Sequence, residues 1–92
     1  MSQPRRALRI DKNQKEIVQA LRDVGAWVYS IGQPFDLLVL WKDRWQIFEV
    51  KEGNGTLTAG QKRTLDDIKS SGWDVESVKI VRSVQEAIGA LE

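Results

Sequence analysis

Apolar residues recur every three or four positions along residues 12–24, the spacing of one face of an α-helix. The members of this stripe are Ile17, Val18, Leu21 and Val24. Asp11 and Gln14 stand three residues apart, as in a capping box with Asp in place of Ser or Thr. Gly25 directly follows the stripe and is a typical helix end. The pattern therefore predicts a helix over residues 12–24.

Three stretches of strand length follow, at residues 26–31, 36–41 and 45–51. Gly32-Gln33-Pro34 separates the first from the second, and Lys42-Asp43-Arg44 separates the second from the third. The second stretch is almost continuously apolar, which is typical of a strand covered on both faces. The short polar turn after it predicts that the second and third strands form a hairpin.

The second half of the chain predicts a helix, a strand and a further helix. Thr58 and Gln61 match a capping box at the start of the first of these helices, and Ser71-Gly72 ends it. A fourth strand is expected over residues 75–81. Ser83, three residues before Glu86, opens the last helix.

This order, αβββαβα, predicts an α/β domain with a central mixed four-stranded sheet flanked by helices. A chain of 92 residues fits a single domain, 1–92, with residues 1–9 as a flexible basic arm. The arm carries Arg5, Arg6 and Arg9, which suit either a solvated terminus or contact with phosphates. So small a core favours association, and the Trp41–Trp45 pair fits either core packing or a dimer contact.

Composition narrows the possible chemistry. The chain has neither cysteine nor histidine, which excludes disulfides, histidine-bound zinc and catalysis by Ser-His or Cys-His pairs. Any metal must be bound by oxygen, which favours Mg²⁺ or Mn²⁺. The net charge is +1, so binding to DNA needs a local basic patch. No membrane-length apolar run or signal peptide is visible, and we expect a soluble, cytoplasmic protein.

Charged residues gather at the end of the otherwise apolar third strand, in Glu49-Val50-Lys51. Because strand side chains alternate, Glu49 and Lys51 project from one face while Val50 points into the core. In an antiparallel hairpin, Asp36 at the start of the second strand lies beside this end of the third. Two close carboxylates repel each other, and a hard divalent cation relieves that repulsion. A Glu-X-Lys sequence alone is usually a solvated strand face; the matching Asp36 favours a metal site.

Pro34-Phe35-Asp36 followed by Glu49-Val50-Lys51 resembles the signature of the PD-(D/E)XK nuclease superfamily. Within it, residues 9–91 are most similar to the stand-alone, phage-like form of the VRR-NUC (virus-type replication-repair nuclease) domains. Further matching segments are Asn13-Gln14-Lys15-Glu16-Ile17, Asp36-Leu37-Leu38-Val39, Leu57-Thr58 with Gln61, and Val81-Arg82-Ser83-Val84. Phe35 departs from the signature, in which proline directly precedes the aspartate; that proline shapes a turn and is not a ligand.

The resemblance implies a restriction-endonuclease-like core and a protein that acts in the cytoplasm of a bacterial or phage-infected cell. It also implies roles for these residues. Asp36 and Glu49 would bind Mg²⁺ or Mn²⁺ through their carboxylates, with the backbone carbonyl of Val50 as a third ligand. Lys51 would lie near the attacking water or the scissile phosphate. Glu16 would be an outer ligand through water, although an exposed helix glutamate looks the same. Gln61 would approach the site from the second helix, although it equally fits the cap of Thr58.

The function implied is metal-dependent endonucleolytic hydrolysis of DNA by a homodimer. Branched DNA or a four-way (Holliday) junction is the favoured substrate, because a two-fold dimer presents two sites to two symmetric strands. A nicking or restriction-type nuclease is the alternative within the enzyme class. A catalytically silent DNA-binding module on the same fold is the alternative outside it.

Overall fold

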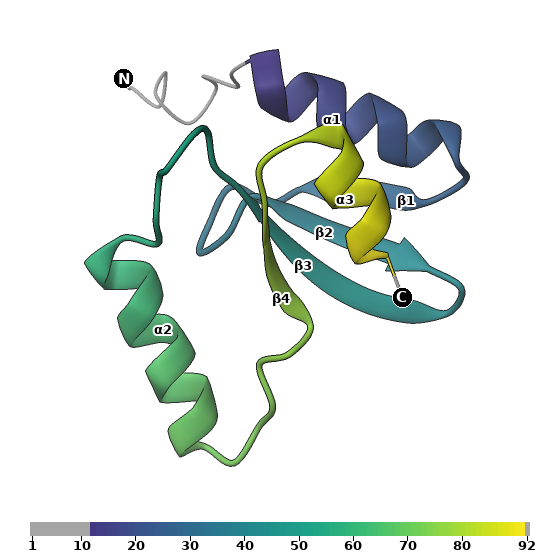
Figure 1. Ribbon diagram of the computed structural model, residues 1–92. Helices are drawn as coiled ribbons and strands as arrows, with labels where there is room; N and C mark the ends of the chain where they lie inside the picture. Colours follow the sequence, from purple (N-terminus) through teal and green to yellow (C-terminus); the bar gives the residue numbers. More distant parts are fainter. Residues whose placement is uncertain (1–11, 92) are drawn as a thin grey trace, which may run out of the picture.

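The computed structural model describes residues 12–91, which fold in the predicted order αβββαβα (Figure 1). The elements are α1 (Lys12–Asp23), β1 (Trp27–Ser30), β2 (Leu37–Trp41), β3 (Arg44–Val50), α2 (Ala59–Ser70), β4 (Val78–Val81) and α3 (Val84–Ala90). The basic arm expected at residues 1–9 and the cap expected at Asp11 lie outside the described residues. Among the described helices, none is both long and apolar enough to cross a membrane.

One mixed sheet with strand order β1-β2-β3-β4 forms the centre of the domain. The pairs β1–β2 and β2–β3 are antiparallel, whereas β3 and β4 are parallel. Parallel neighbours need a long crossover, and residues 51–77, which include α2, provide it. The carboxyl ends of β3 and β4 therefore meet at one edge of the sheet, where Val50 pairs with Val81. This confirms the predicted α/β fold and its mixed sheet.

The β2–β3 hairpin turns through Lys42 and Asp43, which have φ angles of 52° and 65°. Both central residues of a type I′ turn need positive φ, and this turn matches the twist of the flanking strands. Trp41 pairs with Arg44, so Arg44 belongs to β3 and the turn is one residue shorter than predicted. The tight turn fixes the register that brings the start of β2 beside the end of β3.

Helix α1 ends one residue before the predicted position. Gly25, at φ 104°, donates to the Arg22 carbonyl, and the N–H of Ala26 donates to the Leu21 carbonyl, the pattern of a Schellman motif. Ile17 and Leu21 are buried, but Val24 lies past the helix end and is 45% exposed. The helical spacing therefore predicted one residue too many for the buried stripe, because the chain turns back at Gly25.

The caps predicted for the other helices differ in completeness. Thr58 and Gln61 form a full capping box at the start of α2. At α3 the Ser83 hydroxyl accepts from the N–H of Glu86, as expected. The Glu86 carboxylate, however, accepts from the N–H of Arg82 and not from that of Ser83. The capping pair at α3 is therefore only half of a box.

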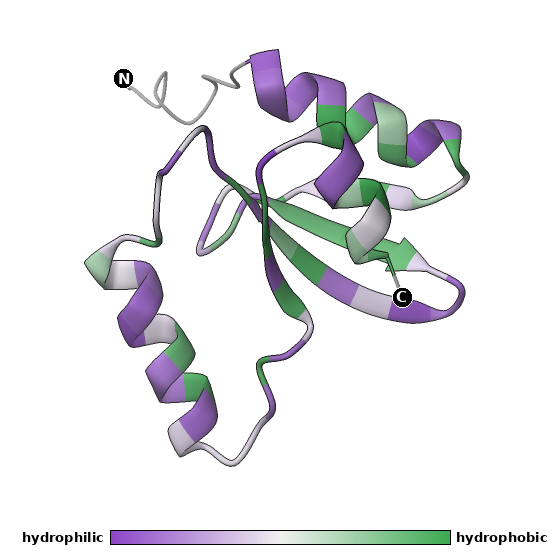
Figure 2. Ribbon diagram, viewed as in Figure 1, coloured by the Kyte–Doolittle hydropathy of each residue, from purple (hydrophilic) through white to green (hydrophobic). Residues whose placement is uncertain are grey.

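The main core lies between one face of the sheet and the helices α1 and α3, which lie together in Figure 1. Its buried members are Ile17, Leu21, Ala26, Val28, Leu37, Val39, Phe48, Val50, Val81 and Ala87. Figure 2 shows the green, hydrophobic run along β2 beneath these helices. Helix α2 stands apart in Figure 1 and contributes no buried residue.

The opposite face of the sheet is only partly covered. Cross-strand pairing places Leu40 between Trp27 and Trp45, and Leu38 between Tyr29 and Ile47, on this face. Leu38 and Leu40 are half-buried, so β2 is not enclosed on both sides as its apolar run suggested. The three aromatic rings are at least half exposed: 50% for Trp27, 56% for Tyr29 and 56% for Trp45.

The tryptophans of the hairpin therefore have different environments. Trp41 packs against the main core, and the ammonium of Lys42 lies 5.4 Å from its ring centroid. Trp45 meets Trp27 edge to face at 6.0 Å, and Trp27 stacks on Tyr29 at the same centroid distance. Core packing thus accounts for Trp41, while Trp45 belongs to an exposed aromatic cluster of Trp27, Tyr29 and Trp45.

Candidate functional site

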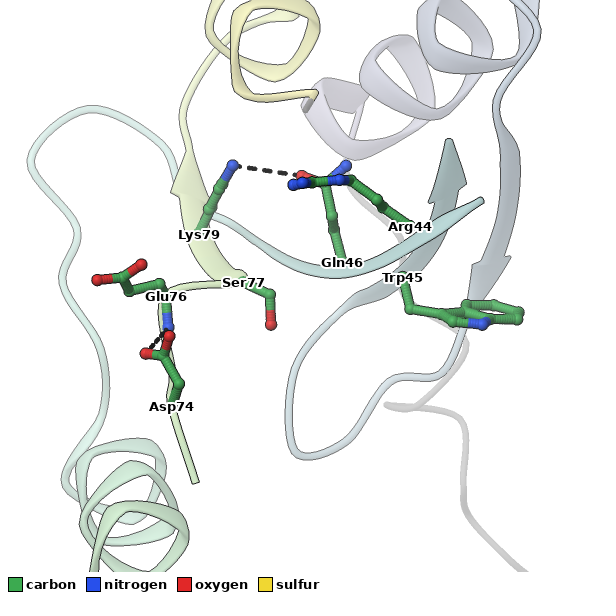
Figure 3. Close-up of a pocket in the computed structure, with 7 residues that line it drawn as sticks. All are labelled: Arg44, Trp45, Gln46, Asp74, Glu76, Ser77 and Lys79. Carbon is green, nitrogen blue, oxygen red and sulfur yellow. Dashed lines mark hydrogen bonds between the residues drawn. The ribbon is translucent and has the colours of Figure 1, made fainter. Parts of the chain in front are cut away.

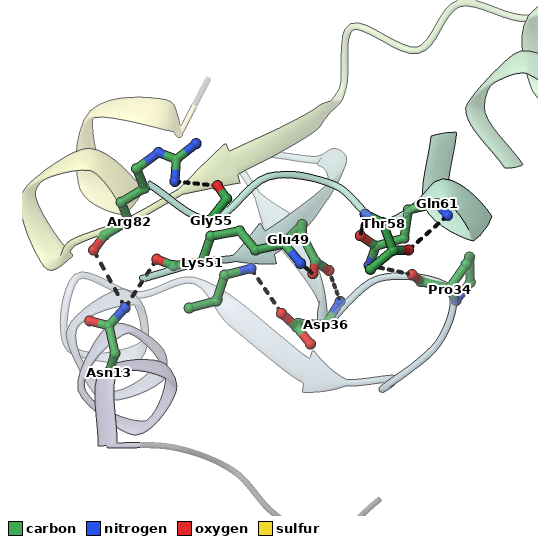
Figure 4. Close-up of polar contacts among 10 residues, drawn as sticks. Asn13, Pro34, Asp36, Glu49, Lys51, Gly55, Thr58, Gln61 and Arg82 are labelled. Carbon is green, nitrogen blue, oxygen red and sulfur yellow. Dashed lines mark hydrogen bonds and ion pairs between the residues drawn. The ribbon is translucent and has the colours of Figure 1, made fainter. Parts of the chain in front are cut away.

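Asp36 is fixed by its backbone and its side chain at the entrance to β2 (Figure 4). Its carbonyl accepts from the N–H groups of Ile31 and Gly32 at 2.9 and 3.3 Å, which closes the loop after β1. Its N–H donates to Glu49 Oε1 at 3.1 Å, and its Oδ2 accepts from the N–H of Val50 at 2.8 Å. The carboxylate of Asp36 is therefore held directly beside the end of β3.

The end of β3 presents Glu49 and Lys51 away from the core, as the alternation predicted. Val50 packs into the main core, whereas Glu49 is not part of it and is still only 4% exposed. The Lys51 ammonium lies 3.1 Å from Glu49 Oε2. Glu49 Oε1 accepts from the backbone N–H of Asp36, so the Glu49 carboxylate contacts both Asp36 and the Lys51 ammonium. The structure thus brings Asp36, Glu49 and Lys51 together at one edge of the sheet.

Burial has the largest effect on the pKa of the Asp36 carboxyl. Loss of solvent raises the pKa of the Asp36 carboxyl, and the charge and hydrogen bonding of Glu49 raise it further. The N–H of Val50 and the charge of Lys51 lower that pKa without cancelling the rise. The negative charge on Asp36 is therefore disfavoured next to Glu49. A divalent cation bound between two such carboxylates would offset this cost.

Glu16 does not join this pair directly. Across residues 12–91 there is no group of three or more Asp or Glu side chains placed to hold a metal ion. Glu16 is exposed on α1, where it lines a groove of about 420 Å³. The other residues of the groove are Lys12, Asn13, Glu52, Gly53 and Arg82. Its predicted part as an outer ligand through water remains a prediction.

Gln61 uses both ends of its side chain in structural contacts. Its Oε1 accepts from the N–H of Thr58 at 3.0 Å, completing the capping box. Its Nε2 donates to the carbonyl of Pro34 at 3.1 Å, two residues before Asp36. Gln61 therefore connects the first turn of α2 to the loop that carries Asp36. Direct action on a substrate is not needed to account for these contacts.

We expect Gln61→Ala to lower the free energy of unfolding by about 1 kcal/mol, because the capping bond and the contact with Pro34 are lost. Urea denaturation measures this loss. The matched control is Gln85→Ala, a change at an exposed glutamine in the first turn of α3. Unchanged stability with slower DNA cleavage would contradict the structural role and favour a role for Gln61 at the site.

Two side chains that sequence analysis did not single out bind the backbone around Lys51. The Asn13 amide donates to the carbonyls of Lys51 and Arg82 at 3.5 and 3.4 Å. Arg82 Nη1 donates to the carbonyls of Gly53 and Gly55 at 2.9 and 2.6 Å. The signal for Arg82 was the parallel pairing of β3 and β4, which places residues just after both strands at the same edge.

A second pocket lies at the other end of β3, far from Glu49 along the strand. It encloses about 360 Å³ and is lined by Arg44, Trp45, Gln46, Asp74, Glu76, Ser77 and Lys79 (Figure 3). Inside it, the Lys79 ammonium donates to Gln46 Oε1 at 3.3 Å and to the carbonyl of Ala90 at 2.7 Å. These contacts provide hydrogen-bond partners for the buried Gln46 side chain and for the carbonyl of Ala90. We assign no part of the site to this pocket.

No protein family, curated protein or solved structure matches the chain. The resemblance to the VRR-NUC domains therefore remains a hypothesis. The assignment of function depends on the arrangement of Asp36, Glu49 and Lys51 itself.

Proposed function

We propose that the chain is a metal-dependent DNA endonuclease that hydrolyses phosphodiester bonds. The observation that carries the proposal is the contact of Asp36 and Glu49 with each other and of Glu49 with Lys51, at the sheet edge. A carboxylate pair next to an ammonium, with Glu49 buried and Asp36 partly buried, combines groups that bind a cation with a group that stabilises negative charge. Metal-dependent phosphodiester hydrolysis uses both.

The donor set fits Mg²⁺ or Mn²⁺. Asp36 and Glu49 offer carboxylate oxygens, and their mutual repulsion would fall on binding a divalent cation. The carbonyl of Val50 is the proposed third ligand, because it follows Glu49 directly at the same strand end. Glu16 is the proposed outer ligand through water. When bound, the cation supplies Lewis-acid activation of the phosphodiester and of the attacking water.

Lys51 then has a defined task. Its ammonium lies 3.1 Å from Glu49 Oε2, which places a positive charge beside the carboxylate pair. There it orients the attacking water and stabilises the negative charge that develops on the phosphorus centre. Water adds to phosphorus, the bond from phosphorus to one sugar oxygen breaks, and that oxygen leaves as a hydroxyl after gaining a proton.

The test is cleavage of supercoiled plasmid and of a synthetic four-way junction with Mg²⁺, with Mn²⁺ and with EDTA. We expect cleavage with either cation and none with EDTA, because the carboxylates act through a divalent ion. Cleavage that persists in EDTA would contradict the metal mechanism. Equal cleavage of plain duplex and junctions would contradict preference for branched DNA and favour the nicking or restriction-type nuclease.

We further propose a homodimer that selects branched DNA by its shape. The aromatic cluster of Trp27, Tyr29 and Trp45 supports association, because exposed aromatic rings on a partly covered sheet face are typical of interface cores. A two-fold pair presents two sites to two strands of a junction. The dimer would act in the cytoplasm, where a DNA substrate is present.

We expect Trp45→Lys to weaken dimerisation by about 30-fold, because a charge replaces a half-exposed ring in the proposed interface. Sedimentation equilibrium measures the dissociation constant. Trp73→Lys is the matched control, since Trp73 is 71% exposed and lies outside the sheet. An equal effect of both substitutions, or a wild-type monomer at all concentrations, would contradict this interface.

The rival from another class is a silent DNA-binding module. A binding module has no use for a carboxylate pair at this sheet edge, because the pair repels the phosphate backbone unless a cation is bound. The same assay decides between them: junction binding in a gel-shift experiment, without cleavage at any concentration of Mg²⁺ or Mn²⁺, would favour the silent module.

A further inference from the structure

We propose that Arg82 is a positioning residue for Lys51, acting through the loop of residues 53–55. The guanidinium holds this loop against the Lys51 side chain and so keeps the ammonium beside Glu49. The inference rests on the proposed function in one respect, since it gives Lys51 a part in cleavage. The geometry itself does not depend on that function.

The first step is the contact between Arg82 and the loop. Arg82 Nη1 donates to the carbonyl of Gly55 at 2.6 Å (Figure 4), and also to that of Gly53 at 2.9 Å. The N–H of Gly55 in turn donates to the carbonyl of Glu52 at 2.9 Å, which closes the turn. A charged donor makes stronger bonds to carbonyls than a neutral one does. One guanidinium therefore fixes both ends of residues 53–55.

The second step is the contact between the loop and Lys51. A Cβ atom added to Gly55 would lie 3.6 Å from both Cβ and Cδ of Lys51, and 3.2 Å from the Glu52 carbonyl oxygen. The aliphatic stem of Lys51 thus passes the Gly55 backbone so closely that a single added carbon would be in contact with it. Gly55 does not have a positive φ, so its lack of a side chain matters here for space and not for backbone conformation.

The third step concerns the ammonium. The backbone of Lys51 is held separately, because its N–H donates to the carbonyl of Val81 and its carbonyl accepts from Asn13. A lysine side chain has large rotamer freedom, which must be restricted for its ammonium to stay in one place. The loop restricts the stem and the ion pair with Glu49 holds the tip. Arg82 therefore acts on Lys51 through the loop.

The test compares Arg82→Lys with Arg22→Lys. Arg22 also donates to a backbone carbonyl, that of Val28 at 3.0 Å, but its contact lies away from the site. A lysine at position 82 keeps the charge, but its side chain ends one bond short of Nη1, the atom that reaches both carbonyls. We expect kcat for junction cleavage to fall about tenfold with KM unchanged in Arg82→Lys, and neither to change in Arg22→Lys.

A readout that needs no activity separates this inference from the proposed function. The Nζ resonance of Lys51, assigned in ¹⁵N spectra by its loss in Lys51→Arg, should shift in Arg82→Lys and stay in place in Arg22→Lys. If the wild-type chain cuts no DNA, the proposed function fails while this measurement still decides the role of Arg82. An unshifted Lys51 resonance in a folded Arg82→Lys chain would overturn the inference.

Gly55→Ala provides a second variant that leaves Arg82 intact. Its methyl group would lie 3.2 Å from the Glu52 carbonyl oxygen, closer than an ordinary contact, so the turn must shift relative to the Lys51 stem; the same shift of the Lys51 resonance and the same fall in kcat are expected. It decides the matter if Arg82→Lys does not fold. A rise in KM with unchanged kcat in Arg82→Lys would instead make Arg82 a phosphate contact and overturn its positioning role.

Discussion

Replacement of Lys51 by methionine is expected to lower the rate of DNA cleavage by about 100- to 1,000-fold. Methionine keeps an unbranched stem against Gly55 but removes the ammonium next to Glu49. The attacking water then loses its orienting charge, and the developing negative charge loses a partner. The fold should be kept, because the backbone bonds of Lys51 to Val81 and Asn13 do not involve its side chain.

Single-turnover cleavage of the junction with saturating Mg²⁺ measures this loss. Lys69→Met, at an exposed lysine in the last turn of α2, is the matched control and should cut at the wild-type rate. Calorimetric titration with Mn²⁺ should show no loss of cation affinity in Lys51→Met, because the carboxylates remain and a competing positive charge is gone. Normal cleavage by Lys51→Met would remove Lys51 from the mechanism.

The meeting of Asp36, Glu49 and Lys51 could be predicted from the sequence because it depends on local rules. Alternation along β3 places Glu49 and Lys51 on one side and Val50 on the other. The short turn at Lys42 and Asp43 fixes the hairpin register, which carries Asp36 to Glu49. Neither step requires knowledge of how the helices pack. The element order follows equally from periodicity and caps.

Features that depend on long-range packing were not predictable in the same way. The apolar run of β2 indicated two covered faces, but the register places Leu38 and Leu40 on a face that no described residue encloses completely. Composition cannot tell a face buried in the chain from one left for a partner. The contacts of Asn13 and Arg82 with the loop at Lys51 arise only once β4 lies parallel to β3.

Replacement of Asp36 by asparagine is expected to slow cleavage by about 1,000-fold, because a carboxylate ligand supplies several kcal/mol of cation-mediated stabilisation. Asparagine keeps an oxygen that can accept from the N–H of Val50, so the local backbone should hold. The same change has an opposite effect on stability when no metal is bound. Burial raises the pKa of Asp36, so ionising this carboxyl costs more in the folded chain than in the unfolded one.

The sign of this stability effect follows from proton binding. Between the ordinary pKa of 3.8 and the raised value, the folded chain holds a proton that the unfolded chain has released. Stability of the metal-free wild type therefore falls as pH rises through that window and stays lower above it. Asp36→Asn lacks the charge, so it should melt at a higher temperature than the wild type at neutral pH. The two should converge well below pH 3.8, where the carboxyl is protonated in both states.

Thermal denaturation with EDTA and with excess Mg²⁺ tests both effects together. The cation stabilises the wild type by binding only the folded chain, whereas Asp36→Asn has lost a ligand and should gain little. The order of melting temperatures at neutral pH should therefore reverse between EDTA and Mg²⁺. Asp66→Asn, at an exposed aspartate on α2, should follow the wild type in both conditions. If Mg²⁺ raises the melting temperature of Asp36→Asn as much as that of the wild type, Asp36 is not a ligand, and the carboxylate pair needs another explanation.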